Sequence, residues 1–225
     1  MRIARHLNGP PDSGQGGYVA GSLAVRLDGP GADVWLRAPA PLETELREVG
    51  DGRHMEFWDD QTLIAEASAV DVEPDPIPFV DIERARIAGR SYPGAVENPY
   101  ETCFSCGRLR HDGLGIGPGP VADGLVACVW SPRGRVAKEW VWSALDCATG
   151  WAWPLQVTAL VTGRLTGGLV TDAPLDPADP YVVVAGQLES VGRRRISAAA
   201  LFTAGGQRVA AVRGTWLVFG RDQGV

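Results

Sequence analysis

Residues 137–153, AKEWVWSALDCATGWAW, are the stretch that decides the fold. Apolar residues recur in it at intervals of three and four, at Ala137, Trp140, Val141, Ala144, Leu145 and Ala148. This spacing predicts a helix with one apolar face. Asp146 lies among these apolar residues, where a carboxylate is costly unless it has a partner. We therefore expect Asp146 either to take part in chemistry or to order an interface.

A second buried helix is predicted over residues 16–27, GGYVAGSLAVRL. No charged residue occurs between Gly16 and Val25, and Val19, Leu23 and Leu27 are spaced by four. A helix that is apolar nearly all round is buried. Its small residues, such as Gly21, would let a neighbouring sheet approach closely.

Most of the remaining apolar segments read as antiparallel strands joined by short turns. In the first half they are 34–36, 42–49, 54–58 and 62–72; in the second half they are 125–130, 156–165, 181–191, 194–202 and 209–219. Turn signals such as Asp51-Gly52 and Gly205-Gly206 separate them.

An internal repeat divides the chain into two similar halves. Leu46-x-x-Val49-Gly50-x-x-Arg53 recurs as Leu188-x-x-Val191-Gly192-x-x-Arg195, and the elements around each copy follow the same order. We expect an N-terminal half over 1–90 and a C-terminal half over 91–225. The expected fold class is α+β: a double hotdog of two fused halves, each with a curved antiparallel sheet wrapped around one long buried helix. A generic α+β sandwich is the alternative.

Composition limits the classes of protein that fit this chain. Its 225 residues are 45% hydrophobic and carry a net charge of −6, which suits a globular core and argues against a nucleic-acid partner. No apolar run is long enough for a membrane span, and no signal segment is visible. Four cysteines are too few for a disulfide scaffold, so we expect reduced thiols and a cytoplasmic location.

Three short motifs carry a resemblance to a known family. They are Cys103-Phe104-Ser105-Cys106-Gly107 with the following Asp112-Gly113-Leu114, the helix segment 143–152 (SALDCATGWA), and Gln15-Gly16-Gly17. Together they resemble the CFxCG…GL opening, the central helix and the HGG helix start of small thioesterases of the phenylacetyl-CoA type, with Gln in place of His. The chain is thus similar to a double-hotdog member of the acyl-CoA thioesterase superfamily.

The two halves depart from the family pattern in complementary ways. The first half keeps the glycine helix start but has Ala24 where the family has a carboxylate. The second half keeps Asp146 but has no glycine pair at 137–139. The resemblance therefore implies one composite site per chain, built from both halves.

The resemblance also implies roles for individual residues in hydrolysing an acyl thioester. Asp146 would be general base or nucleophile, the Gly17 N–H would polarise the thioester carbonyl, and Gln15 would orient it. Gly16 would allow close approach of the acyl group. Asn8, Trp142 and Thr149 are the remaining candidate substrate contacts. The alternatives are helix capping for Gln15 and Gly17, a turn for Asn8, and core packing for the tryptophans.

The substrate would be an acyl-CoA or an acyl-carrier-protein thioester; the sequence does not decide which. Coenzyme A would enter only as part of that substrate, with no other cofactor. A homodimer of the double unit is expected by analogy with hotdog sheets that pair edge to edge.

Other readings stay open. The chain could be a non-catalytic module that binds acyl or other hydrophobic ligands, or a scaffold. Dehydratase chemistry is less favoured because His6, His54 and His111 lie on neither central helix. No metal is expected, since no second CxxC or CxxH pair follows Cys103-x-x-Cys106. The basic triplet 193–195 is expected to be either a solvent-exposed turn or a binding site for the phosphates of coenzyme A.

Overall fold

The computed structural model describes residues 1–225 except 72, 74, 135, 157, 170–174 and 220–225. The helices are α1 (Gly16–Ala24), α2 (Ile82–Gly89) and α3 (Lys138–Trp151). The strands are β1 (Gly31–Leu36), β2 (Arg47–Gly50), β3 (His54–Asp59), β4 (Thr62–Val70), β5 (Gly119–Ala122), β6 (Leu125–Trp130), β7 (Leu160–Leu169), β8 (Tyr181–Val191), β9 (Arg194–Thr203) and β10 (Arg208–Val218).

The described strands form one antiparallel sheet of ten, in the order β2-β3-β4-β1-β7-β10-β9-β8-β6-β5. Its two halves join where β1 pairs with β7, with Val34 opposite Leu165. Counted outward from this junction, β1, β4, β3 and β2 match β7, β10, β9 and β8 in order. The repeated sequence spans the equivalent hairpins β2–β3 and β8–β9, so the repeat predicted from sequence corresponds to a repeat in the fold.

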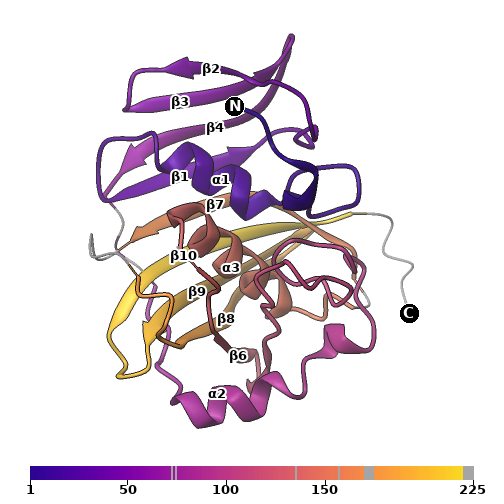
Figure 1. Cartoon of the computed structure of the whole chain (residues 1–225), viewed down its shortest axis with the longest axis vertical. Coiled ribbons are helices and arrows are strands. Elements are labelled where there is room, and N and C mark those ends of the chain that lie inside the picture. The colour runs from indigo at the N-terminus through magenta and orange to yellow at the C-terminus, as the bar shows by residue number, and fades with distance from the viewer. Residues whose placement is uncertain (72, 74, 135, 157, 170–174, 220–225) are drawn as a thin grey trace.

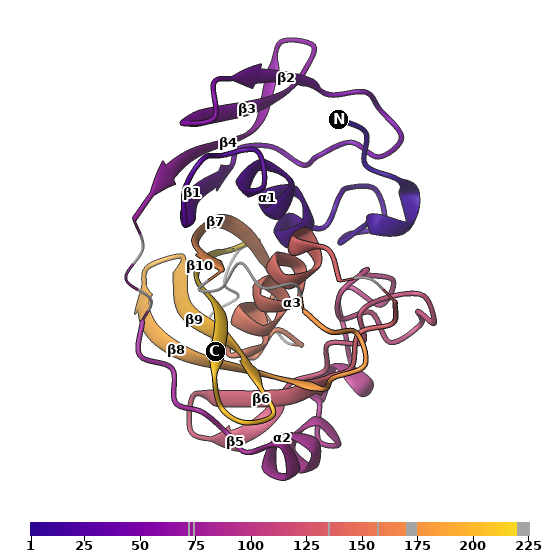
Figure 2. The same ribbon diagram turned by 60° about the vertical axis from the view of Figure 1, so that its left-hand side comes forward.

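The two central helices lie side by side within the curve of the sheet (Figures 1 and 2). Both were predicted from their apolar patterns, and α1 and α3 confirm them with slightly shorter bounds. Their close contact depends on glycine. A Cβ on Gly17 would lie 2.5 Å from Asp146 Cβ and 2.6 Å from the Trp142 carbonyl oxygen, and one on Gly21 would lie 2.7 Å from Glu139 Cα. The curved sheet around the two central helices confirms the double-hotdog prediction, and the sheets of the two halves are fused into one.

Two predicted strands differ most from the observed ones. The strand expected over 42–49 begins only at Arg47; before it, Glu43 has a left-handed φ of 59°, and Glu45 forms a bridge with Arg2 near the N-terminus. Residues 41–46 run beside the N-terminus instead, where the Leu46 N–H donates to the Met1 carbonyl. The strand expected over 156–165 is shifted, since β7 begins at Leu160 and continues to Leu169.

One α-helix, one strand and the short 3-10 helices Arg5–Leu7 and Pro93–Ala95 were not predicted. The polar stretch near 74–100 contains α2, whose first turn is capped by the Asp81 carboxylate accepting from the Arg84 N–H at 2.9 Å. The glycine-rich run before β6 contains β5, an edge strand that tolerates Pro120. α2 packs against β5, β6 and β8. The division of the chain into halves at residue 90 stays a prediction.

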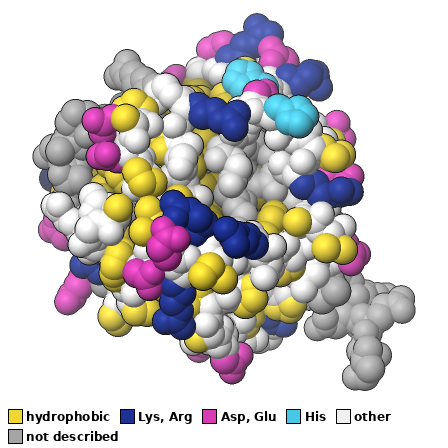
Figure 3. All heavy atoms as spheres, turned by 60° about the horizontal axis from the view of Figure 1, so that its bottom comes forward, with side chains coloured by type: hydrophobic (Ala, Val, Ile, Leu, Met, Phe, Trp, Pro, Cys, Tyr) yellow, Lys and Arg dark blue, Asp and Glu magenta, His cyan; other side chains and the backbone are white. Residues whose placement is uncertain are grey.

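The outer surface agrees with the acidic but mixed composition. On the face drawn in Figure 3, basic and acidic side chains are interspersed among apolar ones and are not gathered by sign. None of the described helices has the length and apolar character needed to cross a bilayer.

Candidate active site between the two central helices

Asp146 lies at the contact between α1 and α3 and is only 1% exposed. Three donors hold its carboxylate, two from the start of α1 and one from β7. Gln15 Nε2 donates to Oδ2 at 2.7 Å, the Gly17 backbone N–H donates to the same oxygen at 2.8 Å, and Thr162 Oγ1 donates to Oδ1 at 2.9 Å. The acid of the second half therefore lies at the N-terminus of the helix of the first half.

The start of α1 explains how Gln15 is oriented. Gln15 is the N-cap residue, and its side-chain oxygen accepts from the Tyr18 N–H at 2.6 Å. With the amide oxygen held by the helix, the amide nitrogen faces Asp146. The free N–H groups and dipole of a helix N-terminus stabilise negative charge. The capping that the sequence offered as one alternative for Gln15 is thus present, and the same side chain also contacts Asp146, which was not predicted.

Burial raises the pKa of Asp146 to about 7, while the hydrogen bonds from Thr162, Gly17 and Gln15 act in the opposite direction. Desolvation penalises the charged form of a carboxyl, and hydrogen bonds to the carboxylate favour it. Near neutral pH, both protonation states of this group are accessible, which is the condition for accepting and returning a proton.

A cavity of about 560 Å³ lies beside this carboxylate and has a mostly apolar lining. Ligand pockets in proteins commonly measure about 300–1,000 Å³ and combine an apolar lining with a few polar groups. The lining comes from residues around 9–16 before and at the start of α1, from 36–40 after β1, from the beginning of β7, from the end of β10, and from three cysteines. Asp146, Gln15 and Thr162 are among the polar groups that line it.

The structure brings together the residues predicted at the helix start, with one change. Gln15 and Gly16 line the cavity with Asp146. Gly17 does not line the cavity, because its Cα packs against α3. Its N–H, which was expected to be free for the substrate, already donates to Asp146. The glycine at 17 thus allows the two helices to approach, whereas Gly16 faces the space where a ligand would lie.

The other three candidate substrate contacts lie away from the cavity. Trp142 packs on Gly21 and lines a separate, smaller hollow near the end of α1. The Thr149 hydroxyl donates to the Asp146 backbone carbonyl and accepts from Trp216 Nε1, so it does not contact the carboxylate. Asn8 Nδ2 donates to two carbonyls in its own turn, those of residues 9 and 10.

The basic triplet 193–195 is also placed by internal contacts. Arg193 donates to the Val218 carbonyl and Arg195 donates to the Gly192 carbonyl, and none of the three arginines lines the cavity.

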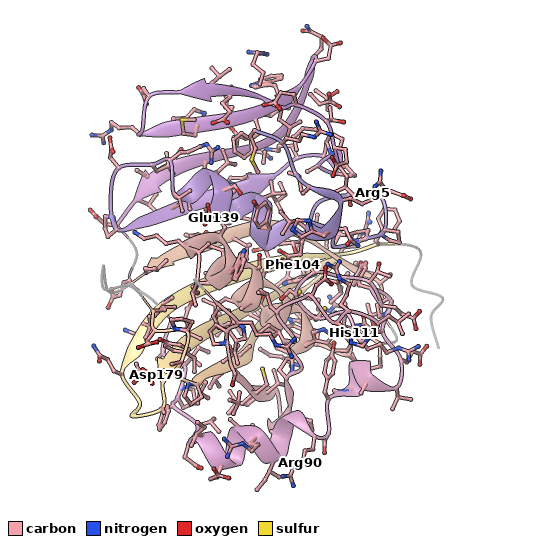
Figure 4. All side chains as sticks on the ribbon, in the orientation of Figure 1. Arg5, Arg90, Phe104, His111, Glu139 and Asp179 are labelled. Atoms are coloured by element: carbon pink, nitrogen blue, oxygen red, sulfur yellow. The ribbon has the colours of Figure 1, made fainter. Side chains whose placement is uncertain are left out.

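Sequence reasoning missed two contributions to the site. Thr162 lies on β7 and reaches Asp146 through the fold, with no local pattern to mark it. The loop that carries the CFSCG motif closes one wall of the cavity with Cys103 and Cys106. Its Phe104, labelled near the middle of Figure 4, packs edge-on against Tyr18 and Trp140, whereas His111 of the same loop is exposed.

Comparison with known proteins supports the fold. No family model matches the sequence, and no curated protein matches it. The structure is similar to the tesB protein of Mycobacterium avium subs paratuberculosis, with a TM-score of 0.60, 14% identity, and coverage of 94% of this chain and 89% of that chain.

Two further solved structures are similar over nearly the whole chain. A protein of unknown function with a hot dog fold from Alicyclobacillus acidocaldarius has a TM-score of 0.62 at 12% identity, covering 98% of this chain and 92% of that one. The acyl-CoA thioesterase II TesB2 from Mycobacterium marinum has a TM-score of 0.56 at 12% identity, covering 95% and 92%. At these identities the similarity shows that the chain has the double-hotdog fold.

Proposed function

We propose that the chain is a thioester hydrolase that acts on an acyl-CoA or acyl-carrier-protein thioester at a composite site between its two halves. The observation that carries the proposal is the buried Asp146 carboxylate, held at the N-terminus of α1 and facing an apolar cavity. The similarity in fold to proteins named as thioesterases adds support.

In the proposed reaction, the acyl chain occupies the apolar cavity and the thioester carbon lies next to Asp146. The carboxylate accepts a proton from a water molecule as that water attacks the carbonyl carbon; the C–S bond then breaks, and the proton passes to the departing thiolate. Alternatively, the carboxylate attacks the carbonyl carbon directly and displaces the thiolate, and water then hydrolyses the resulting mixed anhydride. The carbonyl oxygen gains negative charge in either case and needs a hydrogen-bond donor.

Gly16 offers a donor for that oxygen. Its N–H is the first of α1, it makes no hydrogen bond within the described ranges of the chain, and the residue lines the cavity. Gln15 Nε2 is the second donor close by, although it is engaged with Asp146 before substrate binds. We therefore assign the polarising role to the Gly16 N–H and the positioning of the carboxylate to Gln15 and Gly17.

A second function has a specific observation in its favour. Both carboxylate oxygens of Asp146 already accept hydrogen bonds, which is also what a purely structural acid at a helix contact would do. In that case the cavity would bind an acyl or other hydrophobic ligand without turning it over.

Incubation of the wild-type chain with a panel of acyl-CoA esters separates the two functions. The panel would include phenylacetyl-CoA and straight-chain esters, with release of the coenzyme A thiol followed by a colorimetric reagent and binding followed by calorimetry. Hydrolysis above the uncatalysed rate supports the proposal. Binding without release of thiol would establish the alternative and overturn the hydrolase.

A further inference from the structure

Three buried cysteines meet at one wall of the cavity. Cys103, Cys106 and Cys147 are each 5% exposed or less, and their sulfur atoms all lie within 4.8 Å of one another. Cys103 and Cys106 come from the CFSCG loop, and Cys147 comes from α3, next to Asp146 in sequence. The fold therefore completes a set of three thiols that the sequence shows only as one pair and one separate cysteine.

The spacing of the sulfurs suits a shared metal ion. Zinc binds thiolate sulfur at about 2.3 Å in a tetrahedron, so two sulfurs on the same ion lie roughly 3.8 Å apart. The Sγ atoms of Cys103 and Cys147 are 3.8 Å apart. A disulfide requires about 2.05 Å, so these two sulfurs are not bonded to each other.

The loop is built to keep its two sulfurs in place. The Gly107 N–H donates to the Cys103 carbonyl at 2.9 Å and closes a tight turn around the CxxC pair. A Cβ at Gly107 would lie 2.5 Å from the Cys103 carbonyl oxygen, so the turn requires glycine there. The Cys106 carbonyl accepts from Asn98 Nδ2 at 2.9 Å and from the Tyr92 hydroxyl at 3.0 Å.

Hydrogen-bond donors around the cluster suit thiolates better than apolar packing. Gln15 Nε2 lies 3.5 Å from Cys147 Sγ and can donate to it. The indole N–H of Trp151 is buried and makes no hydrogen bond within the described residues.

We propose that Cys103, Cys106 and Cys147 bind a thiophilic metal ion, with Zn²⁺ as the expected ion, and leave its fourth ligand position facing the cavity. Binding forms three metal–sulfur bonds, and any of the three sulfurs still protonated releases its proton to solvent. Three thiolates around Zn²⁺ leave a single net negative charge, which the surrounding N–H groups stabilise. Asp146 is not needed as a ligand, because both of its oxygens already have partners.

The ion would join the CFSCG loop to α3 and so fix one wall of the cavity. Its open position, beside Asp146, is where a water molecule or a sulfur-containing ligand could bind. The proposal does not depend on hydrolysis, because metal content can be measured whether or not the chain turns over a thioester.

The chain contains its own matched control for the test. Cys128 is also buried, but it lies on β6 and packs in a different part of the core. The full chain would be purified under reducing conditions without chelator, and zinc and copper would be measured by mass spectrometry for wild type, Cys103→Ala, Cys147→Ala and Cys128→Ala. We expect about one ion per chain for wild type and Cys128→Ala. Cys103→Ala and Cys147→Ala should lose most of it.

A spectroscopic measurement on wild type keeps the test decisive if the cysteine variants do not fold. Co²⁺ added to metal-free wild type should give thiolate-to-metal charge-transfer bands and tetrahedral ligand-field bands, and Zn²⁺ should abolish both. Copper in place of zinc would support the same three-sulfur site with a different ion. Absence of both metals with no cobalt bands, equal metal loss in Cys128→Ala, or a Cys103–Cys147 disulfide in the native chain would overturn the proposal.

Discussion

Replacement of Gly17 by alanine tests whether the helix contact holds the site together. The added Cβ would lie 2.5 Å from Asp146 Cβ, 2.6 Å from the Trp142 carbonyl oxygen and 2.8 Å from Ser143 Cα. Two of these atoms are backbone, so α3 has to move away as a unit. Overpacking of this kind costs about 1–3 kcal/mol, more than the roughly 1 kcal/mol that alanine gains over glycine in a helix.

Movement of α3 also stretches the hydrogen bond from the Gly17 N–H to Asp146, and a bond to a charged group contributes about 1.5–3 kcal/mol. We therefore expect the free energy of unfolding to fall by about 1–4 kcal/mol in Gly17→Ala. For a chain of this size, each kcal/mol lowers Tm by about 2–4 °C.

Urea denaturation followed by tryptophan fluorescence measures the change, and Gly16→Ala is the matched control. A Cβ at Gly16 would meet only side-chain atoms, Leu36 Cδ1 at 3.1 Å and Thr162 Cβ at 3.3 Å, which can shift. Its stability should stay within about 1 kcal/mol of wild type. Equal stability of the two variants would refute the close helix contact as the reason for glycine at 17.

Two further predictions concern single contacts. Thr162→Val keeps the shape of the side chain but removes the donor to Asp146 Oδ1, so we expect a loss of about 1–3 kcal/mol in urea denaturation; an unchanged midpoint would mean that the hydroxyl does not support the acid. Glu48 has a pKa lowered from 4.5 to about 2, chiefly by the hydrogen bond from Arg26, with a further contribution from the N-terminal amine. A lowered pKa in the folded state adds stability above pH 4.5 that is lost as the pH falls toward 2, so stability measured from pH 5 to 3 should decline less steeply in Glu48→Gln. Parallel decline in the two chains would contradict this assignment.

The elements with strong apolar patterns were predictable from the sequence. The helix around Asp146 and the charge-free segment after Gln15 are buried in the structure as their patterns indicate. The hairpin repeat at Val49-Gly50 and Val191-Gly192 matched because each hairpin occupies the same place in its half of the sheet. The apolar pattern of the sequence was sufficient to predict an element when its buried residues lie on one helix face or in one run of strand residues.

The unpredicted parts depend on contacts or on local backbone that the pattern does not show. In α2 only Ala85 and Ala88 are buried, so its apolar signal is weak. β2 begins only at Arg47 because Glu45 pairs with Arg2, a contact distant in sequence.

The same holds for the site. The pairing of Asp146 with residues at the start of α1 was inferred from complementary changes in the two halves. Thr162 reaches Asp146, and Cys147 reaches Cys103 and Cys106, only through the three-dimensional fold.

The most direct test of the proposed site compares acyl-CoA turnover by wild type and Asp146→Asn, with substrate affinity measured by calorimetry on the same preparations. Asparagine keeps the size of the side chain but cannot accept the proton. We expect turnover to fall by a factor of about 100 to 10,000 while the dissociation constant changes little. Equal turnover by two folded proteins would contradict the composite site.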